Sequence, residues 1–195
     1  MALFRSSSSP EPFSPIEGEG IVLRIPQMSD HQPWADLREG SRKFLTPWEP
    51  TWPADDLTRA AFRQRLRRYA EDMRADLAYS FLIFRKEDNA LVGGLALANI
   101  RRGVAQAGSL GYWTGAPYIR RGYMTAAVRA LVPAAFSLLK LHRVEAACIP
   151  TNLASTRLLE KTGFRREGYA RSYLCINGIW QDHLLYARLD TDPNP

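Results

Sequence analysis

The sequence contains only two cysteines and three histidines in 195 residues. Two thiols cannot cross-link a domain of this size, and neither Cys148 nor Cys175 belongs to a Cys-x-x-Cys pair. The histidines are scattered along the chain, so the residues that most often bind zinc form no cluster. We therefore expect reduced thiols, a cytoplasmic location and no metal.

Long apolar runs are missing as well. The most apolar stretch, 126–141, is interrupted by Arg129, Pro133 and Lys140, so it does not read as a membrane span. The first ten residues lack the apolar core that is typical of a secretory signal. The sequence also contains no G-x-x-x-x-G-K-[S/T], G-x-G-x-x-G or H-E-x-x-H motif, which disfavours a P-loop, a dinucleotide fold and a zinc protease.

The composition is that of a folded globular protein, with 46% hydrophobic and 24% charged residues. The net charge is +6, and only four of the 26 basic residues are lysines. Such an excess of arginine favours an anionic partner, either phosphate groups or an RNA-rich surface such as the ribosome. A well-solvated basic surface is an equally good explanation of the same charge.

The length suits one domain. We expect a flexible lead-in at 1–15, which holds a serine run and three prolines, a single domain at 16–190 and a short tail at 191–195.

Apolar periodicity and turn residues predict the order β-α-α-β-β-β-α-β-α-β-β. The expected strands cover 21–25, 79–84, 91–98, 108–113, 143–149, 164–176 and 179–189. The expected helices run from 29 or 30 to 44, from 55 or 56 past 73, from 122 to 139 and from 153 to 162. This order predicts a mixed α/β (α+β) domain with an antiparallel front half and a helical crossover behind it.

One segment, 111–125, places two arginines and a glycine where a helix begins. Cations are unfavourable at a helix N-terminus because that end is already positive, so an anion would offset Arg120 and Arg121. Gly122 would let the backbone approach that anion closely. The segment therefore predicts a diphosphate cradle, although an ordinary basic turn has the same residues.

A second segment, 150–164, starts the next predicted helix. Asn152 is a good N-cap residue, which is a sufficient structural reason for its presence. Ser155 falls on the first turn, and Gly163 ends the helix before the strand that begins at Phe164.

Together these segments resemble the GCN5-related N-acetyltransferase (GNAT) superfamily, and especially its bacterial RimJ/RimL branch, which acetylates the N-terminal amine of ribosomal proteins. The family's acetyl-CoA loop, Q/R-x-x-G-x-G/A, falls on 119–124. Ile119 and Met124 depart from that pattern, although methionine at the last position resembles the RimJ type. The more specific blocks are Asn-x-x-Ser-x-x-Leu-x-x-x-x-Gly-Phe from Asn152, Glu-Gly-Tyr at 167–169 and Asn-Gly-x-Trp-x-Asp at 177–182. The likeness is strongest over 110–189 and looser at Pro47–Pro50 and the first strand.

The resemblance implies the GNAT fold and acetyl-CoA as co-substrate. The residues it implies for acetyl-CoA binding are Trp113, Thr114, Arg120, Arg121, Gly122, Tyr123, Met124, Thr125 and Asn152. It also implies direct attack of an amine on the thioester, with Glu167 as general base and Ser155 as donor to the departing sulfur. Many relatives have a tyrosine where this chain has Leu159, which cannot donate a proton. Trp48, Glu49 and Tyr173 are candidates for the mouth that admits the acceptor, and packing roles explain the two aromatic residues equally well.

Three functions stay open at this stage. The first is acetylation of the N-terminal alanine of a small-subunit ribosomal protein, which is chemically easier because an α-amine has a pKa of about 7.7–8.0 against about 10.4 for lysine. The second is acetylation of a small-molecule amine, such as an antibiotic or polyamine. The third is a non-catalytic basic module that binds RNA or assists ribosome assembly.

Overall fold

A computed structural model describes residues 14–195. The predicted lead-in at 1–15 therefore lies almost wholly outside the described residues. The strands are β1 (Ile16–Gly18), β2 (Ile21–Arg24), β3 (Tyr79–Arg85), β4 (Leu91–Arg101), β5 (Ala107–Thr114), β6 (Arg143–Cys148), β7 (Arg165–Ile176) and β8 (Ile179–Leu189). The α-helices are α1 (His31–Gly40), α2 (Arg42–Leu45), α3 (Arg59–Arg74), α4 (Tyr123–Ser137) and α5 (Leu153–Lys161). Single 3-10 turns occur at Met28–Asp30, Thr46–Trp48 and Ala116–Tyr118.

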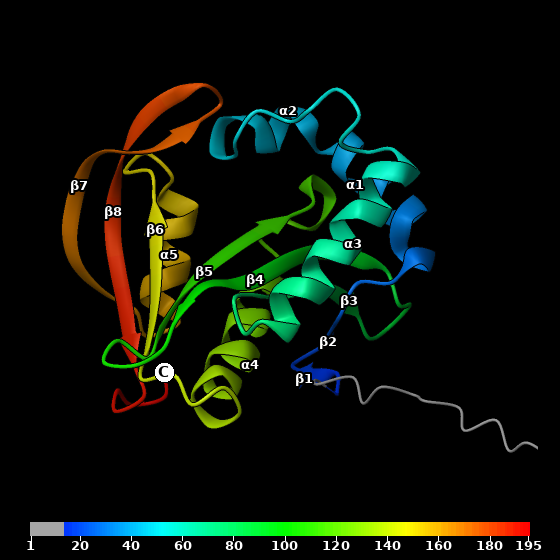
Figure 1. The fold of residues 1–195 in the computed structure, drawn as a ribbon. Helices are drawn as coiled ribbons and strands as arrows, with labels where there is room; N and C mark the ends of the chain where they lie inside the picture. The colour runs from blue at the N-terminus through cyan, green and yellow to red at the C-terminus, as the bar shows by residue number, and fades with distance from the viewer. Residues whose placement is uncertain (1–13) are drawn as a thin grey trace, which may run out of the picture.

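All described strands form one mixed sheet in the order β1-β2-β3-β4-β5-β6-β8-β7 (Figure 1). Every neighbouring pair is antiparallel except β5 and β6. This parallel pair is joined only over Ala107–Ser109 and Arg143–Glu145. Beyond those residues the two strands separate, and Figure 1 shows them diverging from a common lower end. The sheet therefore has a V-shaped opening in its middle, which we call the β5–β6 opening.

Both faces of the front half of the sheet are covered. Along β3, Phe81 and Ile83 join the core cluster that includes α4, whereas Leu82 and Phe84 join a second cluster with Trp34 of α1 and Phe62 of α3. Alternate side chains of a strand point to opposite faces, so a nearly continuous apolar run is what a strand covered on both sides needs. The helices α4 and α5 lie on one face, and α1 and α3 lie on the other.

The predicted mixed fold and element order are confirmed, with three changes at the front of the chain. The helix expected over 29–44 is interrupted at Ser41, where the chain leaves helical geometry and the buried hydroxyl accepts a hydrogen bond from the N–H of Ala116 at 2.9 Å. The following helix begins at Arg59 and not at 55 or 56, because the Thr58 hydroxyl caps the N–H of Ala61. The short strand β1 was not expected, since three residues carry too little periodicity.

No helix in the described part of the chain is long and apolar enough to cross a membrane. Within 14–195 there is also no group of three or more His, Cys, Asp or Glu residues placed to hold a metal ion.

Candidate active site

The β5–β6 opening is bridged by one side-chain hydrogen bond. Tyr112 lies on β5 beyond the last residue that pairs with β6, and its hydroxyl is 2.5 Å from the hydroxyl of Ser155 on α5. Burial raises the pKa of the Tyr112 phenol, so this group stays protonated. The structure thus places the predicted serine at the opening, next to a tyrosine that the sequence analysis did not select.

The first turn of α5 is fixed by Asn152. Its side-chain oxygen accepts a hydrogen bond from the N–H of Ser155 at 3.1 Å, which makes Asn152 the N-cap of the helix as predicted. Leu159 lies one turn further along the same face and is fully buried in the main core. The cap fixes the backbone of Ser155, and the apolar leucine offers no hydroxyl at its own position.

The first turn of α4 is not capped in this way. Its N-cap residue, Gly122, has a φ of 84°, and no side chain of the described residues caps the helix. The first backbone N–H groups of an α-helix have no partner within the helix, so here they are available to a ligand. A Cβ atom at Gly122 would meet nothing within 4 Å, which shows that the space in front of the turn is open. Both arginines before it, Arg120 and Arg121, are exposed.

The other residues of the α4 turn that were predicted to bind acetyl-CoA differ in whether their side chains are available to a ligand. The side chain of Met124 is buried in the core, so only its backbone faces the turn. The hydroxyl of Tyr123 accepts a hydrogen bond from Arg85 at 3.3 Å, and Thr125 is partly buried. This turn therefore offers mainly backbone N–H donors and the two exposed arginine side chains.

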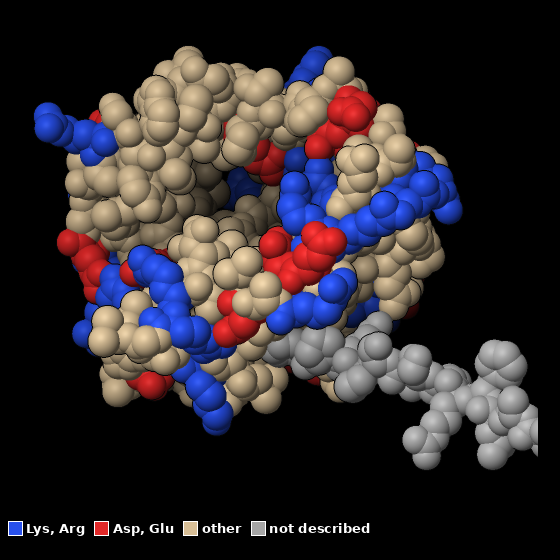
Figure 2. All heavy atoms as spheres, in the orientation of Figure 1, with Lys and Arg blue, Asp and Glu red and all other residues tan. Residues whose placement is uncertain are grey.

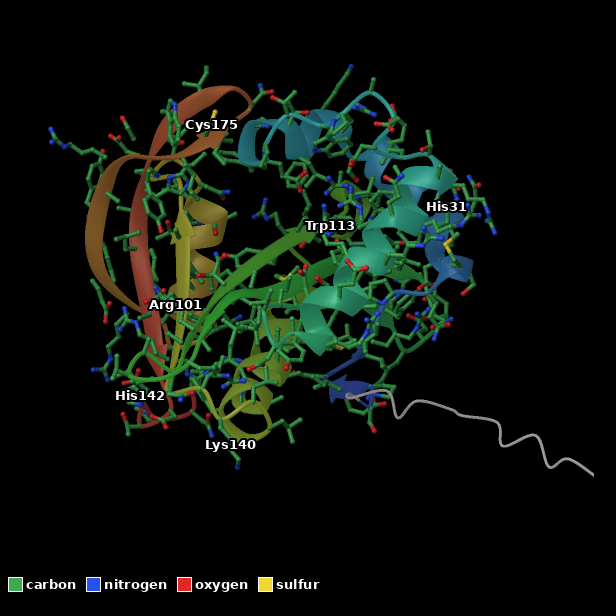
Figure 3. The ribbon with its side chains drawn as sticks, viewed as in Figure 1. His31, Arg101, Trp113, Lys140, His142 and Cys175 are labelled. Atoms are coloured by element: carbon green, nitrogen blue, oxygen red, sulfur yellow. The ribbon has the colours of Figure 1, made fainter. Side chains whose placement is uncertain are left out.

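A cavity of about 290 Å³ lies on the other side of β5. The residues that line it include Trp34, Arg38, Glu49, Phe62, Arg65, Tyr69, Tyr112 and Trp113. Trp113, at the far end of β5 (Figure 3), joins the cluster formed with α1 and α3 and packs against Gly94, where a Cβ would come within 2.7 Å of the indole nitrogen. Figure 2 shows a hollow in the surface, with basic side-chain atoms inside it. The side chain of Trp113 therefore faces this cavity and not the uncapped turn of α4.

Glu49 is the only carboxylate among the described residues that line the cavity. Its two oxygens accept hydrogen bonds from Arg38 at 2.8 and 2.7 Å, and one of them also accepts from the indole N–H of Trp52 at 2.7 Å. The guanidinium of Arg38 in turn lies over the rings of Trp52 and Trp113, at 4.0 and 4.9 Å from their centroids. A carboxylate has about four lone-pair sites, and three of them are used here, so one site remains on Oε1.

Two loops meet at Glu49, one of the residues that line the cavity. The N–H of Asn177, in the turn between β7 and β8, donates to the carbonyl oxygen of Glu49 at 2.9 Å. We call this hydrogen bond the clasp. It joins the β7–β8 hairpin to the segment before α3, two parts of the chain that Figure 1 shows on opposite sides of the opening.

Glu167 lies away from these groups. It stands on β7, the outer strand, and both its oxygens accept hydrogen bonds from Arg143. This guanidinium lowers the pKa of the Glu167 carboxyl. Because β6 and β8 separate β7 from β5, the strand of Glu167 is at least about 14 Å from that of Tyr112, at roughly 4.8 Å per strand and with β5 and β6 separated at Tyr112. The structure does not bring Glu167 next to Ser155.

The two aromatic candidates for the acceptor mouth also lie outside the residues that line the cavity. Tyr173 is exposed on β7 and packs edge-on against His183, with ring centroids 5.7 Å apart. Trp48 ends the 3-10 turn before Glu49 and is partly buried. Of the predicted acceptor residues, Glu49 alone faces the cavity.

Three residues of this region were missed in the sequence, namely Arg38, Trp52 and Tyr112. The position of Arg38 carried a signal, because it follows Trp34 by four residues and so continues the buried side of the helix, where a charge is unexpected. Tyr112 shares a strand face with Leu110, so alternation alone placed it opposite Trp113. Trp52 had no comparable signal.

Comparison with known proteins identifies the chain. The sequence profile of the family described as "Acetyltransferase (GNAT) domain" matches residues 21–165. The chain belongs to the GNAT acetyltransferases. This membership confirms the resemblance and makes the protein an N-acetyltransferase.

Among the relatives, a probable N-acetyltransferase of Bacillus subtilis, YjcK, is 38% identical over 177 residues, which are 91% of this chain and 98% of the relative. The ribosomal protein uS5-alanine N-acetyltransferase of Escherichia coli is 32% identical over 90% of each chain. The crystal structure of the ribosomal-protein-S5-alanine acetyltransferase from Vibrio fischeri matches with a TM-score of 0.85 and 33% identity, over 94% of this chain and all of that one. RimJ of Mycobacterium smegmatis, in complex with CoA-disulfide, matches with a TM-score of 0.84 and 29% identity, over 91% of this chain and 86% of that one.

Proposed function

We propose that this GNAT enzyme transfers the acetyl group of acetyl-CoA to the N-terminal alanine amine of a small-subunit ribosomal protein, in the cytoplasm. The observation that carries the proposal is the arrangement around the β5–β6 opening. An uncapped helix start lies on one side of the sheet, and a cavity with a single carboxylate lies on the other. Relatives named as ribosomal-protein-alanine acetyltransferases support the acceptor.

The first part of the proposal concerns the acetyl donor, acetyl-CoA. Backbone N–H groups at the start of α4, together with Arg120 and Arg121, would hold the diphosphate of acetyl-CoA. The pantetheine arm would then enter the β5–β6 opening and bring the thioester toward Ser155. The amine nitrogen bonds to the carbonyl carbon, the C–S bond breaks with its electron pair passing to sulfur, and the nitrogen loses a proton to a base.

The second step assigns the acceptor. The free lone pair on Oε1 of Glu49 would accept a hydrogen bond from the incoming amine, with Trp34 and Trp113 enclosing its first residue. The base role that the resemblance gives to Glu167 needs a water molecule or another relay, because the outer strand is distant from the opening. Comparing Glu49→Gln with Glu167→Gln will separate the two carboxylates.

The charge of the cavity favours a peptide N-terminus over a polyamine or an antibiotic with several amines. Glu49 is already paired with the buried cation Arg38, so the cavity offers no excess of negative charge to a polycation. The arginines at 59, 63 and 67 are exposed along α3 and would favour approach to an RNA-rich surface such as the ribosome.

The decisive experiment is an acetylation assay read by mass spectrometry. The purified protein and acetyl-CoA are incubated with an alanine-starting peptide, the same peptide with a blocked N-terminus and an internal lysine, and a polyamine. We expect one acetyl group on the free N-terminus and none on the blocked peptide. Acetylation of the polyamine alone would overturn the acceptor, and no transfer to any amine would favour the non-catalytic alternative.

Placement of the diphosphate is tested at Gly122. Gly122→Glu puts a negative charge in front of the α4 turn, whereas Gly122→Ala introduces the same backbone strain without charge. Calorimetry with CoA should show a dissociation constant raised roughly 10–100-fold for the glutamate variant relative to the alanine variant, since charge-assisted hydrogen bonds are the strong ones. Equal constants for the two variants would refute this placement.

A further inference from the structure

The hydroxyl of Ser155 has more than one partner within reach. It lies 2.5 Å from the Tyr112 hydroxyl, and it also interacts with the thiol of Cys148, the last residue of β6. A serine O–H rotates freely, so its direction is set by whichever neighbour donates to its oxygen. Only a Ser155 hydroxyl that points into the β5–β6 opening can interact with a thioester there.

The position of Tyr112 suits it to donate a hydrogen bond to the Ser155 oxygen. Its ring belongs to the core side of β5, and its hydroxyl spans the gap that the separation of β5 and β6 leaves open. Because the buried phenol keeps its proton, donation from Tyr112 to the Ser155 oxygen is favoured over ionisation. The Asn152 cap holds the serine backbone, so the hydroxyl direction is the freedom that remains.

We propose that Tyr112 is a positioning residue for acyl transfer: its O–H donates to the oxygen of Ser155 and directs the serine O–H toward the thioester sulfur. When the amine attacks and the C–S bond breaks, the electron pair passes to sulfur, which accepts the hydrogen bond from Ser155. Tyr112 keeps its own proton throughout. This inference rests on the proposed use of acetyl-CoA, but not on the identity of the acceptor.

The pair also explains how this chain works with Leu159, whose buried side chain carries no proton to give. A hydroxyl at position 159 is replaced by two others. The Tyr112 hydroxyl on β5 directs the Ser155 hydroxyl on α5, and Ser155 reaches the sulfur. The arrangement stabilises a departing thiolate through a hydrogen bond and needs no buried phenolate, which would be costly.

The test compares Tyr112→Phe, Ser155→Ala and the double variant. We expect each single variant to lower kcat roughly 10–100-fold, the range for losing a hydrogen bond to a charged group, with little change in the KM for acetyl-CoA. The double variant should be no slower than the slower single variant, because the two hydroxyls act as one unit. Multiplicative losses in the double variant, or full activity in Tyr112→Phe, would overturn the proposal.

A second readout needs no acceptor. CoA, which carries an unacylated thiol, is bound to each protein and the pH is raised stepwise. Formation of the thiolate is followed by its ultraviolet absorbance. We expect the bound thiol to have a pKa about one unit higher in Tyr112→Phe than in the unaltered protein, because roughly a tenfold stabilisation of the thiolate is lost. Tyr79→Phe is the matched control, since it removes another core phenol, which lies on β3, two strands from β5, and whose hydroxyl donates to Asp76.

The outcomes separate the two proposals. An unchanged thiol pKa in Tyr112→Phe, or an equal rise in Tyr79→Phe, would refute the positioning role even if the peptide is acetylated. Failure of every peptide in the acetylation assay would refute the acceptor, while the titration still reports on Tyr112.

Discussion

Among the described carboxylates that an arginine holds through both oxygens, Glu49 lies in the cavity and Glu167 lies at the outer edge of the sheet. In the cavity pair, the side chains of Arg38 and Glu49 are only 9% and 18% exposed. In the edge pair, Arg143 and Glu167 are 27% and 46% exposed. The chemistry is the same, but the cavity pair is withdrawn from water and lies where an acceptor can reach it. Position relative to the β5–β6 opening, and not residue type, distinguishes a candidate site from a surface ion pair.

The largest difference should be in folding stability. Arg38→Met leaves a largely buried carboxylate with only Trp52 as a hydrogen-bond donor, and breaking a buried pair in this way costs about 3–5 kcal/mol. Urea denaturation followed by circular dichroism measures the free energy of unfolding. A loss below about 1 kcal/mol would mean that the cavity pair behaves like a surface pair.

Catalysis should differ next. Glu49→Gln keeps the shape of the side chain but removes its charge, and we expect kcat/KM for the peptide acceptor to fall roughly 10–100-fold. Glu167→Gln, assayed at the same acetyl-CoA concentration, should retain most of the activity if its pair with Arg143 is structural. A greater loss in Glu167→Gln than in Glu49→Gln would break the comparison and restore the general-base role that the family resemblance implies.

A smaller effect is expected when the edge pair is broken. Arg143→Met removes both hydrogen bonds to Glu167 and one to Glu145, but ion pairs of this exposed kind contribute only about 0–1 kcal/mol each. The same urea experiment measures it, with Arg38→Met as the reference. A loss as large as that of Arg38→Met would show that the outer strand depends on this pair.

The smallest effect concerns acid. Arg143 holds the pKa of Glu167 below its usual value, so the pair stabilises the fold above the unfolded pKa of about 4.3 and loses this contribution as pH falls through the lowered folded pKa. The stability gap between the unaltered protein and Glu167→Gln should be below about 1 kcal/mol at pH 7 and should shrink in acid. Urea denaturation midpoints of both proteins, measured at pH 7 and in acid, give this stability gap. A gap that does not change with pH would contradict the lowered pKa of Glu167.

The sequence was most informative where local rules decide the structure. Neighbouring residues determine the Asn152 cap, the left-handed Gly163 that ends the same helix, the Asn177-Gly178 hairpin turn and the order of most strands. The break at Ser41 could not be foreseen, because its hydroxyl bonds to Ala116, 75 residues away.

The cavity was invisible for the same reason. Arg38, Glu49 and Trp113 come from three segments, and their meeting depends on how α1 packs against β5. The family resemblance supplied Glu167 and Ser155 without their distances, and only the strand order shows that Glu167 lies across the sheet from the opening.

The clasp between Asn177 and Glu49 has a topological consequence. It converts two separate arms into a ring, and a ring can be threaded by a narrow free end but not by the middle of a folded chain. With the clasp closed, the acceptor proposed above would enter as an unfolded leading residue, whereas a lysine on a structured surface would be kept out by its own neighbours. Selection for the first residue of a polypeptide would then be a matter of geometry before any side chain is read.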